Sequence, residues 1–168
     1  MHEKIKKILV DNELYTIPID IVQLAKKCGF TVLQQELDYD GAIIAKKESF
    51  SINDKSYTKA IIVNINQIGT RKRFTIAHEL AHWFMAPENE RNDLFAHRTD
   101  SLTISNREPK INNFASELLM PIELISQALQ NVQFSNEISP NFIIYIADLF
   151  GVSYAAAQVR LEKYVRGQ

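Results

Sequence analysis

The segment with the clearest chemistry is His78-Glu79-Leu80-Ala81-His82, in which two histidines flank a glutamate at the spacing H-E-x-x-H. On a helix, residues i and i+4 leave the same face about one turn apart, so both imidazoles can bind one metal ion. The carboxylate of Glu79 then lies beside them as a general base. The segment predicts half of a zinc site able to hydrolyse an amide bond. A core helix with hydrogen-bonded histidines is the alternative interpretation.

A helix that can carry this segment lies between Gly69 and Pro87. Gly69 and Thr70 can open it, and Pro87 stops it, because proline has no amide proton for the helical hydrogen bonds. Apolar residues cover most of its faces, so we expect the helix to be buried. Unpaired polar side chains are costly in such a place, and a metal ion satisfies several of them at once.

Two histidines leave a catalytic zinc site incomplete, because such sites usually have three protein ligands and a further position for water. The extended motif with a third histidine is excluded, since glutamate stands where that histidine is needed. A carboxylate on a second helix is the alternative, and Glu108 is our candidate. It shares a helical stripe with Asn112, Ala115 and Leu119, whereas Glu117 lies about half a turn out of phase.

Two longer phrases resemble the ImmA/IrrE family of zinc metallopeptidases. Residues 71–82 read R-K-R-F-T-I-A-H-E-L-A-H, and residues 108–121 read E-P-K-I-N-N-F-A-S-E-L-L-M-P. The family's phrases have the forms R-F-T-x-A-H-E-x-x-H and E-x-x-x-N-x-F-A-x-x-L-L-M-P, and the resemblance extends more weakly over residues 18–153. The chain departs from them at Ala81, where glycine is usual, and at Pro109, which fits a helix that begins there.

The resemblance implies that His78, His82 and Glu108 bind one Zn²⁺ ion, as in gluzincins, and that Glu79 is the catalytic base. Proteins of this family commonly cleave a helix-turn-helix repressor that is encoded nearby, often in a mobile genetic element or a stress-response locus, and thereby release transcription. No repressor domain is evident in this chain. We therefore expect a stand-alone zinc metallopeptidase whose substrate is a separate repressor protein.

The remaining elements predict an α+β, zincin-like fold. Short helices are expected at 5–12 and 19–28, and strands at 31–37, 42–46 and 59–64. The strands would form a small antiparallel sheet of about three strands, packed on the H-E-x-x-H helix and the second active-site helix. The polar segment 87–105 is expected to be a loop. The chain would form a single domain, with a catalytic core over 1–137 and a helical cap over 138–168.

The carboxyl-terminal part predicts a helix-turn-helix-like pair. Ser139-Pro140 can start a helix through Phe150, Gly151 can end it, and Ser153 can cap another through residue 165. From residue 110 onward, however, the sequence contains four lysines and arginines in total and five acidic residues. This region lacks the excess positive charge that supplies most non-specific DNA affinity. We therefore expect the two helices to pack as a cap rather than to bind nucleic acid directly.

Composition agrees with a small enzyme that has its own core. The chain has 168 residues, 46% of them hydrophobic, with 19 basic and 20 acidic residues. The single cysteine, Cys28, cannot form a disulfide within the chain. No transmembrane run or signal peptide is evident, so we expect a cytosolic protein without a membrane partner.

During hydrolysis of an amide, the negative charge that develops on the carbonyl oxygen usually needs one hydrogen-bond donor besides the metal. His97, Tyr145 and Tyr154 are candidates that the sequence does not separate, and Asn112 can instead orient a metal ligand. Two other functions stay open. The chain can be a non-catalytic regulator that binds DNA or a partner and keeps the zincin fold as a scaffold or sensor, or a component of a toxin-antitoxin-like two-gene system.

Overall fold

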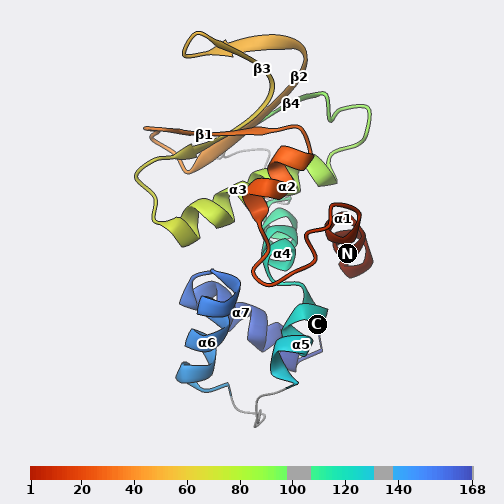
Figure 1. The fold of residues 1–168 in the computed structure, drawn as a ribbon, viewed down its shortest axis with the longest axis vertical. Helices are drawn as coiled ribbons and strands as arrows, with labels where there is room; N and C mark the ends of the chain where they lie inside the picture. The colour runs from red at the N-terminus through yellow and green to blue at the C-terminus, as the bar shows by residue number, and fades with distance from the viewer. Residues whose placement is uncertain (98–106, 131–137, 168) are drawn as a thin grey trace. The chain divides into compact units, whose positions relative to one another are not determined.

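The computed structural model describes residues 1–97, 107–130 and 138–167 (Figure 1). These residues form two compact units. Residues Ile21–Ala115 make up the sheet unit, and Met1–Asp20 with Ser116–Gln168 make up the helical unit. The predicted boundary between core and cap at residues 137 and 138 touches a segment outside the described residues, so it stays a prediction.

The sheet unit contains a mixed sheet of four strands in the order β1-β3-β2-β4. The strands are β1 (Thr31–Gln35), β2 (Gly41–Ile52), β3 (Lys55–Asn64) and β4 (Asp93–His97). β2 pairs antiparallel with β3 and β4, whereas β1 pairs parallel with β3. The α+β class is confirmed, but the sheet is neither three-stranded nor wholly antiparallel. The continuous buried run from Ala60 to Val63 explains the order, because a strand buried on both faces occupies the interior of a sheet.

β4 corrects the prediction of a loop over residues 87–105 at residues 93–97, and residues 98–105 lie outside the described residues. Its five residues pair with Ala42–Lys46 of β2 at the edge of the sheet. Phe95, in its middle, is 58% exposed. A short edge strand with an exposed aromatic residue lacks the alternation of apolar and polar residues that marks a half-buried strand. For this reason the sequence pattern did not reveal it.

Two helices lie on one side of the sheet (Figure 1). They are α2 (Ile21–Lys27) and α3 (Gly69–Met85). α3 contacts α2 and the strands β2, β3 and β4, and its side chains from Thr75 to Ala81 are buried. The core that results contains Ile43, Ile61 and Leu80, all fully buried. α4 (Glu108–Leu119) begins in the sheet unit, and its last four residues belong to the helical unit.

The helical unit consists of that end of α4 with α1 (His2–Asp11), α5 (Ile122–Leu129), α6 (Pro140–Phe150) and α7 (Tyr154–Val165). The side chain of Ser139 accepts a hydrogen bond from the amide of Phe142, and that of Ser153 accepts one from Ala156. Gly151 has the left-handed backbone of a helix end, with φ 63°. The predicted capping of both helices is therefore confirmed. Among the described helices none is by itself long and apolar enough to cross a membrane, and α6 and α7 pass that test only as a pair bent by 107°.

A buried charged pair lies in the core of the helical unit. Glu117 is 1% exposed and Arg160 is 3% exposed. Nη2 of Arg160 lies 4.0 Å from Oε1 of Glu117, and Nε of Arg160 donates to the carbonyl of Met120 at 2.9 Å. Glu117 also contacts His2. Burial lowers the pKa of Arg160 to about 10, which still leaves the guanidinium charged at neutral pH.

Candidate metal centre

The H-E-x-x-H motif lies in the buried second half of α3. His78 is 2% exposed and Glu79 is 1% exposed, while the side chain of His82 keeps 20% of its surface. The Nε2 atoms of the two histidines are 3.1 Å apart, and their ring centroids are 4.8 Å apart. One turn of helix therefore brings both ring nitrogens to the same point, which is the arrangement that the spacing predicted.

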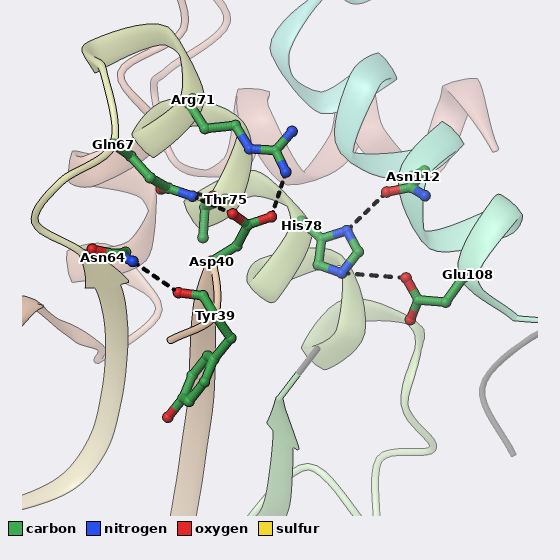
Figure 2. Close-up of polar contacts among 9 residues, drawn as sticks. All are labelled: Tyr39, Asp40, Asn64, Gln67, Arg71, Thr75, His78, Glu108 and Asn112. Carbon is green, nitrogen blue, oxygen red and sulfur yellow. Dashed lines mark hydrogen bonds and ion pairs between the residues drawn. The ribbon is translucent and has the colours of Figure 1, made fainter. Parts of the chain in front are cut away.

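Glu108 joins the two histidines from a second helix. One carboxylate oxygen lies 3.5 Å from Nε2 of His78 (Figure 2). The other lies 3.4 Å from Nε2 of His82. Glu108 is the first residue of α4, and Pro109 follows it in the first turn. Proline is tolerated there because the first amides of a helix have no partner within the helix. The helix therefore begins where the sequence indicated, with Pro109 in its first turn.

Asn112 lies one turn after Glu108 on α4 and faces the other side of the His78 ring (Figure 2). Its side-chain oxygen is 2.9 Å from Nδ1 of His78. An amide oxygen only accepts hydrogen bonds, so Nδ1 of His78 carries the proton and donates it. In a neutral ring, Nε2 then keeps its lone pair, which points toward Glu108 and His82. Asn112 therefore selects the tautomer that can bind a metal.

The donor set fits a divalent transition metal. Ligand atoms at bonds of about 2.0–2.1 Å around a tetrahedral Zn²⁺ ion are roughly 3.3 Å apart. Nε2 of His78 and Nε2 of His82 are 3.1 Å apart, and the two different oxygens of Glu108 lie 3.5 Å from the first and 3.4 Å from the second. One ligand atom from each residue lies within 4.8 Å of the others. Two imidazoles and one carboxylate suit zinc better than magnesium or calcium, which prefer oxygen ligands. Three protein ligands are also the number typical of catalytic zinc sites.

The protonation state of His82 agrees with a role in metal binding. Burial lowers the pKa of His82 below its ordinary value, because desolvation disfavours the charged imidazolium. The ring is therefore neutral near pH 7. Only the neutral ring offers a lone pair to a metal.

The structure also shows which elements hold the other residues considered from the sequence. Glu117 contacts Arg160 and His2 in the core of the helical unit. Tyr145 and Tyr154 belong to the helical unit too, each 43% exposed. His97 ends β4, where its backbone is paired with Ala42. A role for His97, Tyr145 or Tyr154 as an oxyanion donor stays a prediction.

A polar network beside the start of α3 was not predicted from the sequence. Asp40 accepts hydrogen bonds from Gln67, at 2.7 Å, and from Arg71. Gln67 in turn accepts a hydrogen bond from the hydroxyl of Thr75 at 3.1 Å. We call these four residues the Asp40 network (Figure 2). The sequence shows Asp40-Gly41 only as a turn, because the partners of Asp40 lie 27 and 31 positions away.

Comparison with known proteins agrees with this geometry. The family model described as the IrrE N-terminal-like domain, a peptidase family, matches residues 42–162. The matched part includes the H-E-x-x-H motif, Glu108 and Asn112, and it covers more than half of the chain. No curated protein is significantly similar to the chain. Because this match covers the segment that contains His78, His82 and Glu108, the chain belongs to the ImmA/IrrE family of metallopeptidases.

Proposed function

We propose that this protein is a zinc-dependent peptidase in which His78, His82 and Glu108 bind the metal and Glu79 is the general base. The convergence of one carboxylate and two imidazoles within 4.8 Å carries the proposal. Bound zinc would supply Lewis acidity toward a peptide carbonyl and toward water. The fold by itself is compatible with several functions. Membership in a metallopeptidase family is therefore further support for this chemistry.

The remaining chemistry belongs to side chains of the protein. Glu79 precedes His82 by three residues, so the two lie about 60° apart around α3. In the proposed reaction the Glu79 carboxylate accepts a proton from the attacking water as the new carbon–oxygen bond forms. It then returns the proton to the leaving amine as the carbon–nitrogen bond breaks. Asn112 keeps the His78 ring in the required tautomer throughout.

We infer further that the substrate is a separate helix-turn-helix repressor encoded nearby, cleaved at a specific site in the cytosol. The family resemblance supports this inference. The charge balance from residue 110 onward also supports a protein target, because it lacks the excess of lysine and arginine that direct DNA binding requires.

One observation favours a second candidate function. Five large apolar side chains on α6 and α7 are between 43% and 52% exposed, namely Ile144, Tyr145, Tyr154, Val159 and Val165. Exposed apolar and aromatic residues are typical of protein-binding surfaces. They would suit a regulator that binds a partner without cutting it, alone or as part of a toxin-antitoxin-like pair.

Co-expression with the helix-turn-helix protein encoded beside the gene tests these alternatives. Wild-type protein should deplete that repressor, whereas Glu79→Gln should bind it uncut. Both proteins should contain equal zinc, because Glu79 is not a ligand and glutamine has nearly the same shape. Equal depletion by both variants would show that the loss is not hydrolysis by this chain. If wild type leaves the repressor intact but forms a stable complex with it, the partner-binding function replaces the peptidase.

A further inference from the structure

α3 begins without stabilising groups of its own. Its N-cap, Ile68, makes no side-chain capping bond, and the first turn contains no acidic residue. Arg71, Lys72 and Arg73 instead place positive charge near the helix start. Positive charge there is unfavourable, because the amino terminus of a helix has a partial positive charge. The start of the helix that carries His78 therefore depends on groups from other segments.

The Asp40 network supplies those groups. The Asp40 carboxylate accepts from Arg71 and Gln67, so it brings negative charge to the positive end of α3. The backbone of Asp40 is held as well, because its carbonyl accepts from the amide of Asn64 at 3.0 Å. Asn64 also donates its side-chain amide to the carbonyl of Tyr39 at 3.2 Å (Figure 2). The same amide donates to the carbonyl of Leu37 at 2.6 Å. The network thus links α3 to the start of β2 and the end of β3.

A second contact sets the distance between α3 and β2. A Cβ atom on Gly41 would lie only 2.5 Å from Cγ2 of Thr75 and 2.7 Å from the carbonyl oxygen of Ile62. Both distances are well below van der Waals contact, so only glycine leaves room for Thr75 at this point. Thr75 is 2% exposed. Its methyl group packs on the strand while its hydroxyl donates to Gln67.

We propose that Thr75 is a positioning residue for the metal centre and acts together with Gly41 and with the other members of the Asp40 network. Thr75 precedes His78 by three residues and Glu79 by four, so it lies one turn before both on the same side of α3. The ligands come from two helices, α3 and α4. A shift of α3 would change the distances from both histidines to Glu108, while the distance between the histidines would stay the same.

The proposal also accounts for the threonine in the phrase R-F-T-I-A-H-E. A hydroxyl and a methyl on one short side chain satisfy both the Gln67 bond and the packing against Gly41. Valine would keep the packing and lose the bond, and serine would do the reverse. The inference rests on the proposed metal site. Its test therefore begins with the zinc affinity of the wild-type protein.

Two glycines offer a matched comparison. Gly41→Ala introduces the two close contacts, whereas Gly69→Ala adds a methyl group at a position with nothing within 4 Å. We expect Gly41→Ala to lower zinc affinity roughly 10- to 100-fold, as loss of groups that orient metal ligands commonly does. It should also change the visible absorption spectrum of the Co²⁺-substituted protein, which reports ligand geometry. Gly69→Ala should match wild type in both measurements, made by chelator competition and absorption spectroscopy on the full chain.

Adding Thr75→Ser to Gly41→Ala removes the methyl group from the closer contact and should recover part of the lost affinity. If Gly41→Ala does not fold, Thr75→Val and Asp40→Asn decide the matter, because each removes hydrogen bonding and adds no atoms to the core. Both should fold and bind zinc at least threefold more weakly than wild type. Wild-type affinity and an unchanged Co²⁺ spectrum in all of these variants would overturn the positioning role and leave the proposed function intact. A wild-type chain that binds no zinc would overturn the proposed function and, with it, this inference.

Discussion

Nδ1 of His78 donates a hydrogen bond to the side-chain oxygen of Asn112 over 2.9 Å. Asn112 follows Glu108 by one turn on α4, so this helix contributes one proposed metal ligand and also orients another. The His78 ring is held between the two residues. Since His78 is buried, no solvent molecule can easily take the place of Asn112.

Asn112→Ala should therefore bind zinc about 10- to 100-fold more weakly than wild type, because the tautomer and orientation of His78 are no longer fixed. Asn112→Asp should keep most of the affinity, since a carboxylate also accepts from Nδ1. Chelator competition measures both. Gln127→Ala is a suitable control, because Gln127 is an exposed amide on α5. Equal affinity of Asn112→Ala and this control would contradict the role of Asn112.

Metal content should separate the two glutamates of α4. Metal-replete wild type is expected to contain about one zinc per chain, and His78→Ala, His82→Ala and Glu108→Ala should lose it. Glu117→Gln should retain it, because Glu117 contacts Arg160 in the core of the helical unit. Elemental analysis of the purified proteins provides the measurement. A metal-deficient Glu117→Gln that is still folded would show that the ligand assignment is wrong.

Glu117 should instead matter for stability. Glu117→Ala removes one carboxylate from beside the buried guanidinium of Arg160 and leaves Glu123, whose charge also acts on it. Loss of one partner of a buried ion pair typically costs about 3–5 kcal/mol. The double variant Glu117→Leu/Arg160→Met should be less destabilised than the single one, since it removes both charges. Urea denaturation, followed by circular dichroism, gives the free energy of unfolding. If Glu117→Ala unfolds at the same urea concentration as wild type, the pair contributes nothing to stability.

The lowered pKa of His82 predicts a pH effect in the metal-free protein. Burial keeps the pKa of His82 below its ordinary value of 6.5. At a pH between the folded-state pKa of His82 and 6.5, the unfolded chain binds more protons than the folded chain. The free energy of unfolding therefore rises with pH in this range. The contribution of neutral His82 to the free energy of unfolding should be complete above pH 6.5. It should be lost as the pH falls from 6.5 through the folded-state pKa.

Urea denaturation of metal-free wild type and of His82→Gln, at about pH 7.5 and about pH 5.5, checks this effect. Wild type should lose more stability between the two conditions than the variant, because glutamine does not titrate. An equal loss in both proteins would assign the pH dependence to other groups.

Local spacing was sufficient to predict much of this protein. Two histidines four residues apart share a helix face in any α-helix, so their common direction did not depend on the rest of the fold. The same holds for the capping serines Ser139 and Ser153 and for Gly151, because each acts on backbone within a few residues. Helical phase also indicated that Glu108 and Glu117 point to different sides of α4, since nine residues correspond to about two and a half turns.

The strand order and the support of α3 were decided by tertiary structure. β3 lies between β1 and β2, and β4 forms from five residues whose pattern shows no alternation. Asp40 meets Arg71 across 31 positions, and Arg160 meets Met120 across 40. Such pairings depend on the path of the whole chain, since residues far apart in sequence meet only when the elements between them have packed. Local periodicity carries no information about that path.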